Sequence, residues 1–341
     1  MNHRRIALVV AAVLLAGACS GGERLPAAVA APATTEPAEA PGIPECTTAE
    51  AAAIDPLASY DPLAQLPDPG EMPGGSSMAD IVESGRLRVG VSPADLLFGS
   101  RNLAYDPDGT NDDELAFEGF DVEMLKQVAF ALFGPDADLR DVIEFVAIPY
   151  SQRLPKLITG EVDLVAHTMT INCKRWRQIA FSAEYFHAGQ RILVAKGSPY
   201  ASIQELNAAG ATVCVPAGST NLDELNRSYL DVVQDVQPDI SDCLVRMQQG
   251  KVDAITGDDT VLAGLAAQDP TTVVVGEQFT AEPYGLGVNA ERVDLVRFVN
   301  RVLADMLADG RWEASYRKWL VPALTPDVDQ NFQPLYGRPE P

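Results

Sequence analysis

A basic cluster stands out in an otherwise acidic chain. The stretch TMTINCKRWRQIAFSAEYF (168–186) places Lys174, Arg175 and Arg177 directly behind a predicted buried strand. The whole chain has 48 Asp and Glu against 25 Lys and Arg, and a formal net charge of -23. A guanidinium can hold a carboxylate through two parallel hydrogen bonds, whereas an ammonium offers only a point charge. Arg175 is therefore a candidate anion-binding residue, and the alternative is a charged side chain at the surface.

Hydroxyl residues in two other places are suited to the same chemistry. Thr168 and Thr170 are two residues apart, so they direct donors the same way if this stretch is extended. The segment AGSTNLDEL (217–225) places Ser219 and Thr220 at a predicted helix start, where free N–H groups and the helix dipole favour an anion. The alternatives are ordinary strand-end residues and an ordinary N-cap.

Motifs for several other chemistries are missing from the sequence. Beyond His3 the only histidines are His167 and His187, and there is no HExxH, GxSxG or GxxxxGK[ST] motif. The sequence therefore lacks the common motifs for metal-assisted hydrolysis, acyl transfer and phosphoryl transfer. DPDGTNDDE (106–114) departs from the spacing of an EF-hand loop, which favours a solvated turn over a calcium site. We expect no metal and no cofactor, and the net charge argues against nucleic acid as a partner.

The elements that must position these residues alternate between strand-like and helix-like periodicity. This alternation predicts an α/β fold, and 341 residues suffice for two lobes. The predicted strands are 86–91, 162–167, 211–216, 252–256 and 271–276, and the predicted helices are 120–132, 242–250, 292–310 and 311–320.

The N-terminus indicates the compartment. Arg4 and Arg5 precede an apolar run, Ile6–Leu15, and the small residues AGAC end at Cys19. Residues 1–18 have the layout of a secretory signal and are too short to span a membrane. The segment also resembles the bacterial lipobox, in which the cysteine carries a lipid, although Leu stands one place early. We expect lipidation of Cys19 rather than plain secretion.

The residues after the signal are rich in Ala, Pro, Gly and Glu. They predict a flexible tether over 19–77, followed by a domain outside the cytoplasm. If Cys19 is lipidated, Cys46, Cys173, Cys214 and Cys243 remain. An even number of cysteines in an oxidising compartment predicts disulfides, and four cysteines allow three pairings.

Four blocks in a fixed order carry a family resemblance. GFDVEMLKQVAFAL (119–132), GEVDLVAHTMTINCKR (160–175), VDAITGDDTVLAG (252–264) and GRWEASYRKW (310–319) occur as in the extracytoplasmic amino-acid-binding proteins of ABC importers. More narrowly, the chain resembles the glutamate- and glutamine-binding lipoproteins of actinobacteria. The resemblance covers roughly residues 79–321.

The resemblance implies two α/β lobes in the periplasmic-binding-protein fold. The second lobe is inserted in the first, and two strands form the hinge near 189–194 and 283–288. The expected parts are lobe 1 at 78–190 and 284–325, lobe 2 at 191–283 and a C-terminal tail at 326–341. A hinge-bending protein cannot join its lobes covalently without blocking closure. Within this fold we therefore expect Cys214 to pair with Cys243, and Cys46 with Cys173.

The resemblance also assigns roles to the polar residues. It implies that Arg175 holds the α-carboxylate of an amino acid, with Thr168, Thr170, Ser219 and Thr220 as further donors. It also implies that Asp258, rather than Asp259, binds the ammonium. An ammonium that is buried needs a negatively charged partner of this kind.

Three residues in the same lobe concern the ligand side chain. Tyr150 is expected in the wall of the site. Arg153 is expected to meet a side-chain carboxylate, which favours glutamate and aspartate over glutamine and asparagine. His167 is a further candidate for this contact. The alternative for Arg153 is an exposed arginine at a helix start.

The expected function is capture of the amino acid by lobe closure and delivery to a membrane permease, without turnover. Two alternatives remain open. One is an amino-acid sensor for a membrane signalling partner, and the other is a dehydratase-like enzyme on the same fold.

Overall fold

The computed structural model describes residues 46–106, 115–324, 330 and 332–341. The predicted signal peptide, Cys19 and residues 107–114 of the predicted solvated turn lie outside the described residues. Within the described ranges, no helix combines the length and the apolar content that a bilayer span requires.

The first sheet contains strands from both ends of the domain, in the order β5-β1-β6-β13-β7. β1 is parallel to β5 and β6, whereas β13 is antiparallel to β6 and β7. β13 follows all strands of the second sheet in the chain, so the chain returns to complete the first. The bounds are β1 Leu87–Val91, β5 Ile143–Ala147, β6 Leu164–Ala166, β7 Ile179–Phe181 and β13 Gly287–Asn289.

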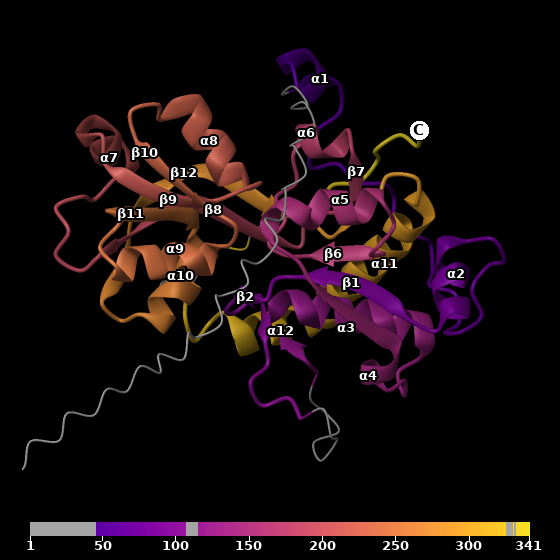
Figure 1. The fold of residues 1–341 in the computed structure, drawn as a ribbon. Helices are drawn as coiled ribbons and strands as arrows, with labels where there is room; N and C mark the ends of the chain where they lie inside the picture. Colours follow the sequence, from indigo (N-terminus) through magenta and orange to yellow (C-terminus); the bar gives the residue numbers. More distant parts are fainter. Residues whose placement is uncertain (1–45, 107–114, 325–329, 331) are drawn as a thin grey trace, which may run out of the picture. The chain divides into compact units, whose positions relative to one another are not determined.

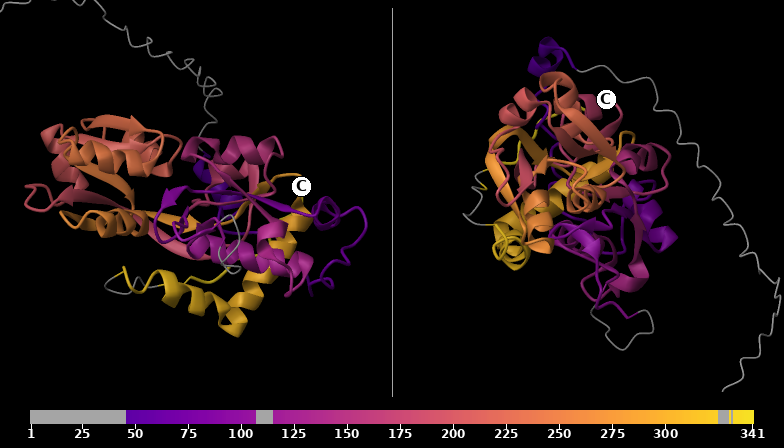
Figure 2. Two further views of the ribbon diagram at one scale, coloured as in Figure 1. Left: turned by 60° about the horizontal axis from the view of Figure 1, so that its bottom comes forward. Right: turned by 60° about the vertical axis from the view of Figure 1, so that its left-hand side comes forward.

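Helices before, between and after these strands pack around the first sheet (Figures 1 and 2). In α3, Phe120, Met124, Val128 and Leu132 are all buried, as their helical spacing predicted. The bounds are α2 Ser77–Ser84, α3 Phe120–Phe133, α4 Leu139–Val142, the 3-10 turn η1 Tyr150–Gln152, α5 Arg153–Ile158, α6 Cys173–Trp176, α11 Val293–Asp309 and α12 Arg311–Trp319.

A small antiparallel sheet follows β1, in the order β2-β3-β4. Its strands are β2 Ala94–Asp95, β3 Gly99–Arg101 and β4 Phe117–Glu118. The turn between β2 and β3 contains Leu97, which has a positive φ of 85°. This sheet places Asp95 beyond the carboxyl end of β1, where parallel sheets commonly bind ligands.

The second sheet has the order β10-β9-β11-β8-β12. The orange part of the chain in Figure 1, roughly residues 200–270, supplies three strands and the helices around this sheet, and β8 and β12 complete it. We call the part of the chain around this sheet lobe 2 and the part around the first sheet lobe 1. The bounds are β8 Phe186–Ala195, α7 Ile203–Ala209, β9 Thr212–Pro216, α8 Thr220–Ser228, β10 Val233–Gln237, α9 Ile240–Gln248, β11 Ala254–Asp258, α10 Asp259–Gln268 and β12 Thr272–Tyr284.

Two long strands connect the lobes. β8 enters lobe 2 and β12 leaves it, and they pair antiparallel from Phe186↔Tyr284 to Ala195↔Thr272. The register shifts between Val275 and Thr280, which marks an irregularity in β12. The structure therefore has the two-lobed periplasmic-binding-protein fold, with lobe 2 inserted in lobe 1.

The predicted tether is wrong for part of its length. The segment after helix α1 (Thr48–Ala53) packs on lobe 1, where Ser59 and Tyr60 are buried. Asn300 donates to Ser59 Oγ at 2.8 Å and to the Tyr60 carbonyl at 2.7 Å. The composition of this segment suggested too few apolar residues for packing. In the structure its few apolar residues pack on lobe 1, and the buried Asn300 side chain hydrogen-bonds its backbone and Ser59.

The C-terminal residues 332–341 lie against the same segment. Ser59 donates its backbone N–H to the Leu335 carbonyl at 2.9 Å, and Arg338 donates its backbone N–H to the Ser59 carbonyl at 3.0 Å. The Arg338 guanidinium lies 3.6 Å from the centroid of the Trp176 ring. Both ends of the described chain thus cover lobe 1.

Both predicted disulfides form. Cys214 of β9 pairs with Cys243 of α9, within lobe 2. Cys46 pairs with Cys173 at the start of α6, across a sequence separation of 127 residues. Neither bond joins the two lobes, so both are compatible with hinge bending.

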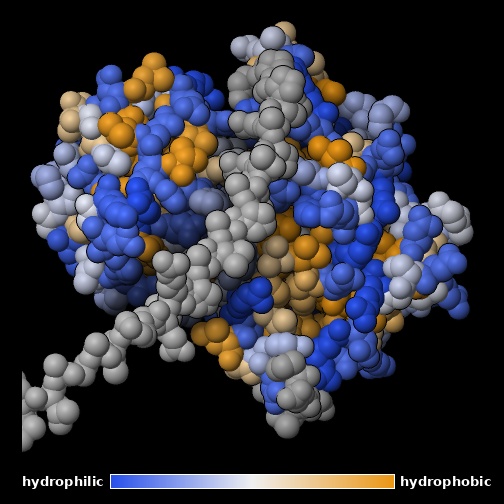
Figure 3. All heavy atoms as spheres, viewed as in Figure 1, coloured by the Kyte–Doolittle hydropathy of each residue, from blue (hydrophilic) through white to orange (hydrophobic). Residues whose placement is uncertain are grey.

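Hydrophilic residues cover much of the face in Figure 3, with hydrophobic residues in smaller groups between them. The most exposed large hydrophobic residues, Leu103 and Leu230, lie in different lobes. Scattered residues of this kind need no partner to explain them.

Candidate functional site

Arg175 lies at the contact between the lobes. It is buried on the short helix α6, where the Asn172 side chain accepts its backbone N–H at 2.8 Å. Its Nη1 donates to the Thr170 carbonyl at 2.7 Å, and its Nη2 to the Gly218 carbonyl of lobe 2 at 3.4 Å. Burial first, and then the charge of Arg153, lower the pKa of Arg175 to about 9. The guanidinium is therefore still charged at neutral pH.

The other two basic residues of this cluster form partly exposed ion pairs, and the pair of Lys174 also joins the two lobes. Lys174 forms an ion pair with Asp223 of α8 at 3.0 Å, and Arg177 forms one with Glu50 at 2.6 Å. Lys174 is half-buried and Arg177 is exposed. One arginine of the cluster is thus directed inward.

Two hydroxyls converge on one carboxylate. Thr170 of lobe 1 and Thr220 of lobe 2 each donate from Oγ1 to Glu282 Oε2 at 2.7 Å. The two hydroxyl oxygens lie 3.2 Å apart. Glu282 belongs to β12, one of the two strands that connect the lobes. This group of residues can therefore bind a carboxylate with donors from both lobes.

Ser219 acts as the N-cap of α8. Its Oγ accepts the Leu222 N–H at 3.1 Å and donates to the Pro216 carbonyl at 2.7 Å. The alternative considered from the sequence, an ordinary cap, describes these bonds. The neighbouring Gly218 has a positive φ of 74°, and a Cβ there would lie 2.8 Å from Ser151 Cα of lobe 1. A glycine is needed for this close approach.

Asp258 ends β11 and is buried. Its Oδ1 accepts Asn221 Nδ2 at 2.8 Å, and its Oδ2 accepts the Tyr284 hydroxyl at 2.7 Å. Burial first, and then the charge of Glu282, raise the pKa of Asp258 to about 8. Asp258 is therefore mostly protonated at neutral pH, and a cation placed beside it would favour the carboxylate.

Asp259 is occupied elsewhere. Its Oδ2 accepts Gln278 Nε2 at 2.7 Å, and its Oδ1 accepts the Thr260 N–H at 2.8 Å. Both aspartates are thus hydrogen-bonded within the protein, and the preference for Asp258 as the ligand residue stays a prediction.

Arg153 is fully buried rather than exposed at the start of α5. Its Nε donates to the Tyr150 carbonyl at 3.1 Å, its Nη1 to the His167 carbonyl at 2.9 Å and its Nη2 to the Gly218 carbonyl at 3.2 Å. The guanidinium also lies 4.5 Å from the centroid of the Tyr150 ring. Only the bond to Gly218 crosses to lobe 2.

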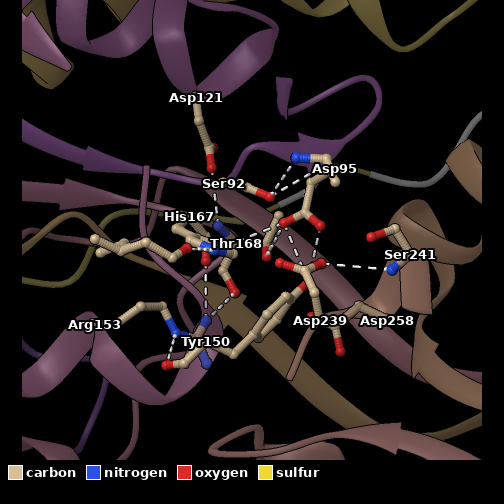
Figure 4. A network of polar contacts seen from close by, with 12 residues as sticks. Ser92, Asp95, Asp121, Tyr150, Arg153, His167, Thr168, Asp239, Ser241 and Asp258 are labelled. Carbon is tan, nitrogen blue, oxygen red and sulfur yellow. Dashed lines mark hydrogen bonds and ion pairs between the residues drawn. The ribbon is translucent and has the colours of Figure 1, made fainter. Parts of the chain in front are cut away.

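Tyr150 and His167 surround a carboxylate that the sequence analysis did not single out (Figure 4). The Tyr150 hydroxyl donates to Asp95 Oδ1 at 3.0 Å. His167 Nε2 lies 3.1 Å from the Ile148 carbonyl, and its Nδ1 lies 3.2 Å from Asp95 Oδ2 without forming a hydrogen bond. Asp239 approaches from the start of α9, and burial, followed by the charge of Asp95, raises the pKa of Asp239 to about 6.

Thr168 has an unusual backbone conformation. Its φ is 42°, which is rare for a β-branched residue. Its N–H donates to Asp121 Oδ2 at 2.9 Å, and its hydroxyl donates to Asp95 Oδ2 at 3.3 Å. Because the backbone is left-handed here, Thr168 and Thr170 do not follow an extended strand as the sequence suggested. Strain of this kind is often found at binding sites.

Four site residues were missed from the sequence. Glu282 stands between Ala281 and Pro283, just before the predicted hinge crossing, and these neighbours gave it no local signal. Asp95 follows the first strand, and the rule that ligands bind at the carboxyl ends of parallel strands could have found it. Asn221 and Tyr284 carry no local signal, because they contact Asp258 from distant parts of the chain.

The described residues contain no group of three or more His, Cys, Asp or Glu side chains arranged to hold a metal ion. The arrangement instead offers a cation and hydroxyl donors on one side and buried carboxylates on the other. It can remove a small zwitterion from water while keeping both of its charges paired.

Residues 99–322 match the family described as bacterial extracellular solute-binding proteins, family 3. The chain belongs to this family. The glutamine-binding protein of an ABC transporter of Bacillus subtilis is 30% identical over 244 residues, which cover 72% of this chain and 84% of the relative. The glutamate-binding protein of Corynebacterium glutamicum is 29% identical over 250 residues, which cover 72% of this chain and 81% of the relative.

A solved structure shows the same fold. It is an ancestral amino acid-binding protein described as a precursor of cyclohexadienyl dehydratase, with 29% identity and a TM-score of 0.61. The match covers 72% of this chain and 99% of that chain. These findings confirm the resemblance inferred from the four sequence blocks. The chain is an extracellular solute-binding protein of family 3.

Proposed function

We propose that the protein captures a polar or acidic α-amino acid between its lobes and delivers it to an ABC-importer permease. The observation that carries this proposal is the pairing of opposite chemistries at the lobe contact. Arg175, Thr170 and Thr220 offer donors for the ligand carboxylate, and Asp258 offers a carboxylate for the ammonium. The names of the two relatives above support glutamine or glutamate as the ligand class.

The proposal includes the anchor and the division into lobes. We assign residues 78–190 and 284–325 to lobe 1 and residues 191–283 to lobe 2. Lipidation of Cys19, after removal of residues 1–18, would hold the protein at the outer surface of the cell membrane. Metabolic labelling with a fatty-acid analogue, compared with Cys19→Ser, tests the anchor.

The deciding experiment is calorimetric titration of the purified domain with each of the twenty amino acids. Binding of glutamate, aspartate, glutamine or asparagine supports the proposal. A ligand at 100 times its dissociation constant should also stabilise the fold by about 2.7 kcal/mol. If none of the twenty amino acids binds, the proposal is contradicted. Loss of uptake on deletion of the gene tests the transport role.

Among these ligands we rank glutamate and aspartate first, because Arg153 can serve a side-chain carboxylate. Its only bond to lobe 2 is the one to the Gly218 carbonyl, and lobe opening would free that donor. Arg153→Met should weaken glutamate binding selectively in competition with glutamine. Equal loss of both ligands would show that Arg153 supports the site without selecting the ligand.

A non-enzymatic role fits this site. The groups at the lobe contact are suited to pairing with the charged ends of a ligand rather than to acting on one of its bonds. The dehydratase-related ancestor makes turnover a question worth testing. Incubation with a prephenate-like acid should return the compound unchanged, and release of water and carbon dioxide would contradict a purely binding role.

A further inference from the structure

Glu282 is a buried carboxylate on a strand that connects the lobes. It lies opposite Ala188 in the pairing of β8 and β12, and only 3% of its surface is exposed. A charge at this depth is retained only with strong hydrogen-bond partners. Its partners therefore indicate what the site is built to hold.

The partners come from both lobes and from the connecting strand. Thr170 of lobe 1 and Thr220 of lobe 2 donate to Oε2, each at 2.7 Å. Thr280, two residues earlier in β12, donates to Oε1 at 2.5 Å. One carboxylate thus bridges lobe 1, lobe 2 and the hinge.

These donors are the ones that the proposed function assigns to the ligand. Thr170 and Thr220 are the predicted hydroxyl donors to the ligand carboxylate, and Arg175 binds the Thr170 carbonyl at 2.7 Å. A hydroxyl has one proton, so it cannot donate to Glu282 and to a ligand carboxylate at the same time. The two carboxylates therefore compete for the same donors.

We propose that Glu282 is an internal counter-ligand, which occupies the carboxylate position and holds the lobes together until an amino acid displaces it. This inference rests on the proposed function. The amino-acid carboxylate takes over the Thr170 and Thr220 hydroxyls, and the Glu282 side chain withdraws along β12. The register irregularity before Thr280 gives this part of the strand room to adjust.

Two consequences follow from this arrangement. The ligand-free protein is more compact than a binding protein without such a residue, because Glu282 links the lobes. The affinity for amino acids is also lower than the Thr170 and Thr220 hydroxyls alone would give, because each ligand must first displace the Glu282 carboxylate from them.

The test compares Glu282→Ala and Glu282→Gln with Glu277→Gln in the full chain. Glu277 lies on the same strand but is exposed, so its variant removes an equal charge without touching the site. Titration calorimetry with glutamate and glutamine should show at least tenfold tighter binding to Glu282→Ala, a smaller gain for Glu282→Gln and wild-type affinity for Glu277→Gln. Equal or weaker binding to Glu282→Ala would overturn the proposal, because Glu282 would then be a bystander or a ligand contact.

A second measurement does not depend on ligand identity. Small-angle X-ray scattering of the ligand-free proteins should give a larger radius of gyration for Glu282→Ala than for wild type and Glu277→Gln, with thermal unfolding as the check on folding. Equal radii would overturn the internal counter-ligand. If none of these proteins binds an amino acid, the calorimetry contradicts the proposed function, and the scattering still decides whether Glu282 holds the lobes together.

Discussion

At the residue scale, the site depends on buried ionisable groups, and a buried charge without a partner carries a large desolvation penalty. Arg175 and Asp258 lie on different lobes, and each is hydrogen-bonded, Arg175 to the Thr170 carbonyl and Asp258 to the Asn221 side chain. A buried charge that loses its partner is penalised far more than a surface charge. Substitutions at these two residues should therefore act on binding much more strongly than substitutions nearby.

Arg175→Ala should lower the affinity for the amino acid by roughly 2–5 kcal/mol, because the ligand carboxylate is then buried without its cation. Lys174→Ala is the matched control. Its ion pair with Asp223 is partly exposed, and pairs of this kind contribute about 0–1 kcal/mol. Calorimetric titration measures both variants, and wild-type affinity in Arg175→Ala would place the binding site elsewhere.

Asp258 should release a proton when the ligand binds. Its pKa of about 8, raised first by burial, leaves it mostly protonated at pH 7, whereas an adjacent ammonium favours the carboxylate. Titrations at pH 7 in buffers with different ionisation enthalpies should therefore show release of up to one proton, and affinity should rise with pH up to about 8. In Asp258→Asn both effects should vanish. An unchanged proton count in that variant would assign the release to another group.

At the element scale, short segments are held in place by links to distant ones. α8 begins at a capped turn with Gly218 against Ser151 of lobe 1, and α9 is tied to β9 by Cys214–Cys243. The N-terminal segment is tied to α6 by Cys46–Cys173. The disulfides therefore have separate tasks, one inside lobe 2 and one at the edge of lobe 1.

Removing the Cys214–Cys243 bond by a double substitution to serine should lower the free energy of unfolding by about 3–4 kcal/mol, on a loop-entropy estimate for the closed segment. The same change at Cys46 and Cys173 should mainly release the segment around α1, because that bond lies at the edge of the fold. Urea denaturation measures the first effect, and limited proteolysis near residue 50 detects the second. Equal protease resistance of both double variants would contradict this division.

At the scale of the whole molecule, buried carboxyls make stability depend on pH. Burial is the first cause that raises the pKa of Asp121 and Asp239 to about 6 and the pKa of Asp258 to about 8. The folded state thus binds protons more tightly than the unfolded state, in which the pKa of Asp is about 3.9. This stabilisation is complete below the unfolded pKa and is lost as pH rises through the folded values.

The free energy of unfolding of the ligand-free protein should therefore fall as pH rises from about 4 to about 8. Asp258→Asn should flatten the part of this curve between pH 6 and 8, since the pKa of Asp258 is the highest of these three. Urea denaturation at a series of pH values measures the slope. A slope in that range that is the same in Asp258→Asn and wild type would contradict the assignment.

Local pattern was sufficient for a large part of this protein. The alternation of strand and helix periods predicted the α/β architecture, and the order of four sequence blocks predicted the family. The need to keep the hinge free predicted both disulfides once the two-lobed fold was in hand. These features depend on neighbouring residues or on covalent limits, so the linear sequence carries them.

The tertiary structure alone decided which polar groups meet. Glu282 receives hydroxyls from residues 112 and 62 positions earlier in the chain, and Tyr150 donates to Asp95 across 55 positions. The composition of the segment around Tyr60 predicted a flexible tether. In the structure this segment packs on lobe 1, where Asn300 of α11 donates a hydrogen bond to the Tyr60 carbonyl. No local period encodes such contacts. The partner of a buried polar group depends on where the folded backbone brings distant residues together, and burial then makes that pairing energetically important.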